Sequence, residues 1–165
     1  MKSNSILVEY NYYYIYPDYD HDQPEHDIAL LRLNTPLKFT SKVQNIKLAE
    51  HNSANNNLES VGRGADETGE NSESLMQIDL VQLTLDQCME ALPPKLRPEI
   101  RQVMERVGDA IICAKRPDNK PGVCNGDSGS PLVRDGSLVG ITAFIFELGH
   151  GCAATNLGFY TNVTT

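Results

Sequence analysis

One short stretch, residues 124–132, carries the residue types and spacing of a nucleophilic enzyme site. It runs Cys-Asn-Gly-Asp-Ser-Gly-Ser-Pro-Leu, so Ser128 lies between two glycines and directly follows an aspartate. Glycine on both sides lets the backbone adopt a tight turn that a Cβ atom would forbid. Such a turn can push the serine hydroxyl outward and aim the N–H groups of Gly126 and Ser128 at one point. A nucleophile beside an oxyanion hole has this geometry.

A serine hydroxyl is a weak nucleophile at its ordinary pKa, so it needs a general base and a group that orients that base. The candidate orienting group is Asp27, which opens an apolar stretch at residues 28–33, Ile-Ala-Leu-Leu-Arg-Leu. Buried beside an imidazole, such an aspartate would fix the tautomer and stabilise the imidazolium. Taken alone, Asp27 also fits a turn or capping residue.

Two strings together resemble a known family. Residues 126–133, Gly-Asp-Ser-Gly-Ser-Pro-Leu-Val, are similar to the active-site signature of trypsin/chymotrypsin-like serine proteases, with Ser130 where the family usually has glycine. Residues 26–33, His-Asp-Ile-Ala-Leu-Leu-Arg-Leu, resemble the segment around the family's triad aspartate. The order, Asp then Ser, and the separation also match. The resemblance implies a serine endopeptidase that works through an acyl-enzyme, with Asp27 and Ser128 as catalytic residues.

A second interpretation is a non-catalytic serine protease homologue that acts as a secreted binding or regulatory module. It predicts that the catalytic histidine is missing from the gene itself. A third, an unrelated extracellular protein held together by disulfides, fits poorly with two matched strings.

The resemblance implies an all-β, trypsin-like double β-barrel with one or two short helices. Residues 1–50 are expected to be a remnant of the first barrel, residues 51–57 a polar linker, and residues 58–165 a nearly complete second barrel. Residues 84–88 carry an N-cap signature in which Thr84 or Asp86 starts a short helix, and apolar residues recur at helical spacing over residues 95–107. Alternating or apolar runs predict strands at residues 6–16, 28–33, 58–64, 75–83, 110–114, 137–144 and 158–163.

The general base is the part of the pattern that this sequence lacks. In the family's order a histidine precedes the aspartate by a long interval, whereas only 26 residues precede Asp27. The four histidines, none of them in the family's Ala-Ala-His-Cys context, are better explained as exposed polar residues. We therefore expect the family's front end to be missing and residues 1–165 alone to show little or no hydrolysis. These histidines are His21, His26, His51 and His150.

A related expectation concerns Asp127, the residue before the nucleophile. In active family members a new N-terminus, released by zymogen cleavage, pairs with this aspartate. The resemblance places that activation segment well upstream of Asp27, so Asp127 is expected to lack its family partner. A charged carboxylate is costly to bury without one. We therefore expect a disordered or zymogen-like oxyanion loop.

The specificity pocket can be assigned by the same resemblance. Gly122 occupies the position where trypsins carry an aspartate, so selection for lysine or arginine is not expected. Ala143, Phe144 and Ile145 correspond to the family's Ser-Trp-Gly wall, and Ile145 in place of glycine narrows the pocket mouth. Gly158 lies on the other wall. The predicted substrate is a polypeptide with a small or medium apolar P1 residue.

Four cysteines allow three disulfide pairings, and four free thiols in a reducing cell are the alternative. The resemblance implies the pairs Cys88–Cys113 and Cys124–Cys152, and with them a secreted, extracellular protein. The protein has no signal peptide at its start, which suggests that the true N-terminus is not included.

Composition excludes other classes. The net charge of −8 argues against nucleic-acid binding and against docking on an anionic membrane. No apolar run approaches the roughly 18 to 20 residues that a membrane-spanning helix needs. The histidines and cysteines do not follow a metal-ligand spacing, so neither a metal nor a cofactor is expected. Protein inhibitors are expected partners besides the substrate.

Overall fold

The computed structural model describes residues 6–50, 55–66, 69–146 and 156–164. The chain divides into two units, Met1–Asn45 (unit 1) and Ile46–Thr165 (unit 2), each of which is described by itself.

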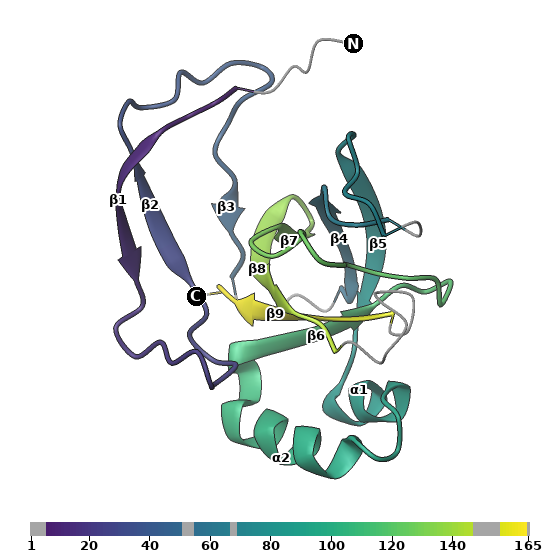
Figure 1. Ribbon diagram of the computed structural model, residues 1–165. Coiled ribbons are helices and arrows are strands. Elements are labelled where there is room, and N and C mark those ends of the chain that lie inside the picture. The colour runs from purple at the N-terminus through teal and green to yellow at the C-terminus, as the bar shows by residue number, and fades with distance from the viewer. Residues whose placement is uncertain (1–5, 51–54, 67–68, 147–155, 165) are drawn as a thin grey trace. The chain divides into compact units, whose positions relative to one another are not determined.

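Unit 1 contains an antiparallel pair of strands, β1 (Tyr10–Ile15) and β2 (Ala29–Leu33), drawn in purple and blue in Figure 1. Tyr14 pairs with Leu30, and a bulge interrupts the register near the start of β1. The tyrosines that predicted a strand over residues 6–16 do form one, although it begins later. Asp27 lies near the end of the long connection between the two strands, two residues before β2 begins at Ala29.

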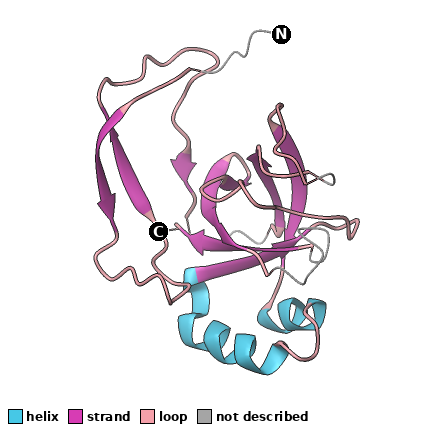
Figure 2. Ribbon diagram, viewed as in Figure 1, coloured by secondary structure: helices cyan, strands magenta, loops and turns pink. Residues whose placement is uncertain are grey.

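Unit 2 is built around a closed barrel of six antiparallel strands (Figures 1 and 2). The strand order is β8-β7-β4-β5-β6-β9, and pairing of β9 with β8 closes the ring. The short strand β3 (Lys47–Leu48) adds to β8 in parallel. The barrel strands are β4 (Asn57–Gly62), β5 (Met76–Gln82), β6 (Ile111–Lys115), β7 (Pro131–Arg134), β8 (Ser137–Phe144) and β9 (Leu157–Asn162).

The barrel strands whose sequences are continuously apolar contribute side chains to two separate core clusters. In β6, Ile112 and Ala114 belong to the cluster inside the barrel, whereas Ile111 and Cys113 belong to a second cluster outside it. Successive side chains of a strand point to opposite faces, so both faces of this strand must be apolar. The inner cluster draws on every barrel strand and comprises Ala49, Leu58, Leu80, Ile112, Ala114, Val123, Leu132, Val139 and Tyr160.

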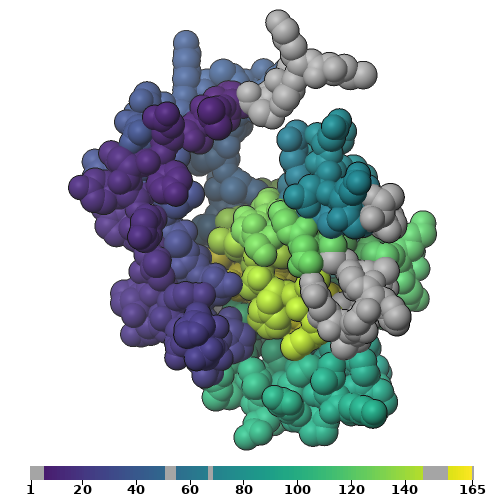
Figure 3. Space-filling view, viewed as in Figure 1, coloured from purple at the N-terminus to yellow at the C-terminus, as the bar shows by residue number. Residues whose placement is uncertain are grey.

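Two helices, α1 (Leu85–Ala91) and α2 (Arg97–Val107), cover the second cluster. Their buried residues, among them Met89, Ile100 and Met104, recur at helical spacing on the covered side. A Cys88–Cys113 disulfide ties α1 to β6, as the family resemblance implied. In the space-filling view this helical segment, coloured teal, forms one end of unit 2 (Figure 3).

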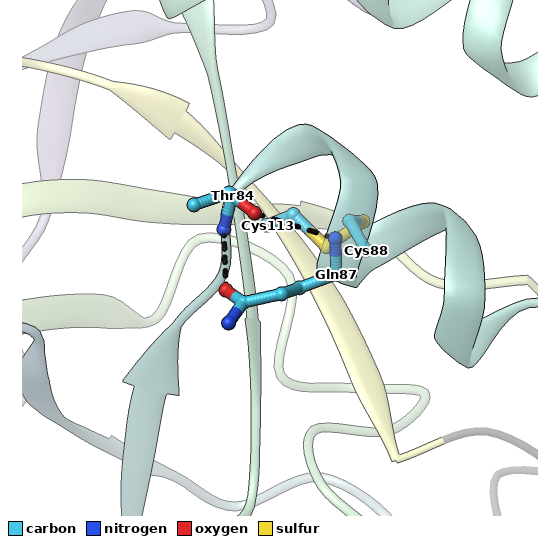
Figure 4. The surroundings of a disulfide bond; sticks show 4 residues. All are labelled: Thr84, Gln87, Cys88 and Cys113. Atoms are coloured by element: carbon cyan, nitrogen blue, oxygen red, sulfur yellow. Dashed lines mark hydrogen bonds between the residues drawn. A yellow bond between two sulfur atoms is a disulfide. The ribbon is translucent and has the colours of Figure 1, made fainter.

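A capping box starts α1 (Figure 4). The Gln87 N–H donates to Oγ1 of Thr84 at 3.3 Å, and the Thr84 N–H donates to Oε1 of Gln87 at 3.0 Å. Two backbone donors of the first turn therefore have partners.

Replacing Thr84 by alanine is expected to lower the free energy of unfolding by about 1 kcal/mol, because an orphan N–H of the first turn loses its acceptor. Urea denaturation followed by circular dichroism measures the change. Thr35→Ala, at an exposed bend, is the matched control. Equal stability of the two variants would contradict the capping role.

Candidate active site

The predicted nucleophile, Ser128, lies exposed on the loop 124–130 that leads into β7. The end of this loop is fixed to β8 by two backbone hydrogen bonds. The Gly129 N–H donates to the Thr142 carbonyl at 2.9 Å, and the Thr142 N–H donates to the Ser130 carbonyl at 2.9 Å. Gly129 has φ +82°, a conformation that residues with a Cβ rarely adopt. The sheet thus holds the turn that carries the exposed Ser128.

The carboxylate of Asp127 is held by backbone N–H groups from two segments. The Gly64 N–H donates to Oδ1 at 2.7 Å, and the Cys124 N–H donates to Oδ2 at 2.9 Å. This approach requires glycine on the facing strand end. A Cβ on Gly62 would lie 2.0 Å from Oδ1 of Asp127, and one on Gly64 would lie 2.5 Å from its Cγ.

The N–H of Ala65, the residue after Gly64, holds the peptide unit that joins Asn125 to Gly126. Ala65 donates to the Asn125 carbonyl at 2.8 Å. The C=O and N–H of a trans peptide point in opposite directions, so this bond turns the Gly126 N–H away from Ala65. Within the described residues, neither the Gly126 N–H nor the Ser128 N–H donates to a backbone carbonyl. Their assignment to an oxyanion hole stays a prediction. We call residues 62–65 the Gly62–Ala65 clamp.

The structure gives Asp127 other partners than the one that the family resemblance implies, and the absence of its family partner stays a prediction. Its family partner is a cation, but this chain gives the carboxylate two neutral backbone donors. Hydrogen bonds to the charged form offset part of the cost of removing a carboxylate from water. The signal in the sequence was Gly-Arg-Gly at residues 62–64, which leaves room for a side chain from elsewhere.

Asp27 is exposed within unit 1, two residues before the start of β2. Residues 26–28 form a three-residue turn in which the Ile28 N–H donates to the His26 carbonyl at 2.8 Å. Since Asp27 belongs to unit 1 and Ser128 to unit 2, their assignment to one site stays a prediction.

Two glycines of the predicted specificity pocket have little room for a side chain. A Cβ on Gly122 would lie 3.2 Å from the Asn156 carbonyl oxygen. A Cβ on Gly158 would lie 2.6 Å from the Tyr160 hydroxyl and 2.7 Å from Cγ2 of Val123. The segments around residues 122 and 158 therefore form facing walls with little space between them.

The third wall segment contains a β-bulge at Ala143, between the paired residues of β8 and β9. Phe144 stacks on Phe159 with ring centroids 4.8 Å apart, so its ring packs in the second core cluster. Ile145 is partly buried and packs against the inner cluster, which includes Val123. The position where the family has glycine thus carries a side chain directed at the core.

Two residues near these walls were not singled out in the sequence. Val123 is buried against Gly158, and Tyr160 is fully buried beside both. Among the described residues, the Tyr160 hydroxyl has no hydrogen-bond partner. Burial, and secondarily the charge of Asp127, raises its pKa well above the usual range. Its position two residues after Gly158 on β9, and so on the same face, could have revealed it.

Cys124 is disulfide-bonded. Its predicted partner, Cys152, lies outside the described residues, as do His51 and His150. The pairing Cys124–Cys152 therefore stays a prediction.

One group of side chains has metal-ligand geometry. Potential ligand atoms of Asp20, His21 and Asp22 lie within 4.8 Å of one another, but all three residues are exposed. Exposed acidic groups often gather in this way without an ion, so the group carries no assignment. Neither helix in the described part of the chain has the length and apolar character needed to cross a membrane.

Comparison with known proteins gives a consistent result. A family model described as Trypsin matches residues 2–165. The chain is 32% identical to trypsin beta of Drosophila erecta over 165 residues, which is 98% of this chain and 60% of that protein. It is 29% identical to the venom serine protease Bi-VSP of Bombus ignitus, covering 99% of this chain and 46% of that protein. The chain thus spans about half the length of the curated relatives it matches.

A solved structure supports the fold assignment. The chain superposes on neuropsin, a serine protease expressed in the limbic system of mouse brain, with a TM-score of 0.75. The match covers 94% of this chain and 66% of the neuropsin chain, at 24% sequence identity. The predicted trypsin-like fold is confirmed.

Proposed function

Because the chain belongs to the trypsin family, we propose that it forms the nucleophile-bearing part of a secreted serine endopeptidase. The observation that carries the proposal is the loop around Ser128. Ser128 is exposed there, and within the described residues the N–H groups of Gly126 and Ser128 donate to no backbone carbonyl. The Gly62–Ala65 clamp holds Asn125, which precedes the two donors, and Asp127, which lies between them. Preorganised donors of this kind stabilise charge that develops in the transition state.

The reaction runs in two halves. Ser128 Oγ attacks the substrate carbonyl carbon while a general base takes its proton, and the carbonyl oxygen becomes an oxyanion held by the Gly126 and Ser128 N–H groups. Collapse of this intermediate expels the amine, protonated by the same base, and leaves an acyl-serine. Water then attacks the acyl carbon by the same route and releases the acid. Asp27 orients the base.

The base is a histidine, which we place upstream of residue 1 in the full-length protein. Support comes from the histidines of this chain, none of which has the family's sequence context, and from the relatives, of which the chain covers 46 to 60%. Residues 1–165 alone are therefore expected to be inactive, since loss of a triad member costs on the order of 10⁴ in rate.

The proposed substrate is a polypeptide with a small or medium apolar P1 side chain. Gly122 brings no charge to the pocket, and Val123 packs tightly against Gly158. Ile145 takes further space at the third wall. Protein inhibitors that present a similar residue are expected to bind the same site.

Labelling with a fluorophosphonate probe tests the proposed function. The full-length protein, after activation, is expected to be labelled at Ser128, and Ser128→Ala to remain unlabelled. Mass spectrometry of the labelled peptide identifies the residue. Absence of labelling in the activated full-length protein would favour the non-catalytic homologue instead. Rapid hydrolysis by residues 1–165 alone would overturn the placement of the base.

A further inference from the structure

The residue before the proposed triad aspartate has an uncommon backbone conformation. His26 has φ 65°, in the left-handed region that residues with a Cβ rarely adopt. Outliers of this kind persist only where the surroundings hold them, and they cluster at functional sites. The neighbouring residue here is Asp27, whose position depends on the φ and ψ angles of His26.

A ring contact holds His26 in this conformation. The imidazole stacks on the Tyr16 ring with centroids 4.6 Å apart and planes 3° from parallel. Tyr16 is itself fixed at the end of the β1–β2 ladder, because its N–H donates to the Ile28 carbonyl at 3.1 Å. The stack therefore links the two ends of the 17–27 connection where it meets the sheet.

The backbone bonds on either side of Asp27 complete the arrangement. The Ile28 N–H donates to the His26 carbonyl at 2.8 Å, and the Ile28 carbonyl accepts from Tyr16. Asp27 is thus the central residue of a tight turn, with one end anchored to the ladder and the other to the ring stack. Loss of the stack removes the ring contact of His26 and leaves its conformation to the backbone bond between Ile28 and the His26 carbonyl.

We propose that Tyr16 and His26 are positioning residues for Asp27, which their ring stack holds in the orientation that the triad needs. The inference rests on the proposed function, since it takes Asp27 to be the group that orients the base. Neither ring takes part in the chemistry.

Substitutions in the full-length activated protein test this role. Tyr16→Leu removes the stack and is expected to lower kcat on the order of fivefold, the typical weight of an aromatic pair. KM is expected to stay near the wild-type value, because substrate binding does not involve Asp27. Tyr16→Phe keeps the ring and is the conservative variant expected to retain kcat. His26→Val, whose β-branched side chain resists positive φ, is expected to lower kcat by roughly tenfold.

A double variant separates positioning from general stability. Asparagine tolerates the left-handed region without a ring partner. The variant with both Tyr16→Leu and His26→Asn is therefore expected to recover kcat relative to Tyr16→Leu alone. Thermal unfolding of each variant shows whether it is folded, and His26→Val supplies the same test should Tyr16→Leu fail to fold.

The outcomes distinguish this inference from the proposed function. If Ser128 of the wild-type protein takes up the fluorophosphonate but Tyr16→Leu and His26→Val leave kcat unchanged, the positioning role is overturned and the protease remains. A double variant as slow as Tyr16→Leu also overturns it. If the wild-type Ser128 is not labelled, the proposed function fails, and this inference fails with it.

Discussion

Replacing Gly64 by alanine is expected to lower kcat of the full-length protease by about 10²–10³-fold, with KM close to its wild-type value. The added Cβ would lie 2.5 Å from Cγ of Asp127, so the carboxylate must move and lose its 2.7 Å bond from the Gly64 N–H. Asp127 separates the two proposed oxyanion donors, Gly126 and Ser128, so its displacement is expected to carry them away from the substrate carbonyl. Steady-state kinetics on a peptide ester and the rate of fluorophosphonate labelling measure the effect.

Gly136→Ala is the matched control for this prediction. Gly136 lies in the turn between β7 and β8 with φ +74°, and no heavy atom lies within 4 Å of the position of an added Cβ. This substitution strains the backbone by about 1 to 2 kcal/mol but touches nothing near Ser128. It is expected to lower stability and leave kcat unchanged. Equal kcat losses in the two variants would show that the clamp has no special role.

Replacing Phe159 by alanine is expected to lower the free energy of unfolding by about 3 to 5 kcal/mol. Phe159 is fully buried on β9, stacked on Phe144 at 4.8 Å and in an edge contact with Phe146 at 5.1 Å. Its removal leaves a cavity between the barrel and the helices and takes away two ring contacts, each worth about 0.5–1.5 kcal/mol beyond burial. A destabilisation of this size amounts to about a fifth or more of the roughly 5–15 kcal/mol by which a typical domain is stable.

Urea denaturation of the wild type and the variant measures this change. Leu75→Ala, at a side chain that is 64% exposed, is expected to alter stability by less than about 0.5 kcal/mol. Phe159→Leu, which leaves a smaller cavity, is expected to fall between the two. A Phe159→Ala variant as stable as Leu75→Ala would refute the importance of the second core cluster.

The local patterns of the sequence were sufficient for most of the fold. The helix N-cap at Thr84 needed only its neighbours within four residues, and the structure confirms it with a full capping box. The predicted strand at residues 137–144 coincides with β8. The disulfide between Cys88 and Cys113 came from the family resemblance and is likewise confirmed. In these cases the determining contacts are local or are common to the family.

The contacts that define the candidate site were harder to predict, because they join segments far apart in the sequence. The hydrogen bond from Gly64 to Asp127 joins residues 63 positions apart, and no periodic pattern encodes it. The tight packing of Val123 against Gly158 is of the same kind. The positive φ of His26 has no local sequence signature either, because its stacking partner, Tyr16, lies ten positions earlier in the chain.

The backbone character of the Gly62–Ala65 clamp has a consequence for how this region tolerates mutation. The clamp holds Asp127 and Asn125 through main-chain N–H groups. The side chains of the clamp residues therefore matter only where they would occupy the space that Asp127 needs. Gly62 and Gly64 face Asp127, but Arg63 between them is exposed. In a saturation-mutagenesis experiment, position 63 would tolerate most substitutions, whereas positions 62 and 64 would tolerate few. Arg63 is therefore a natural attachment point for a spectroscopic label that reports on the nucleophile loop without disturbing it.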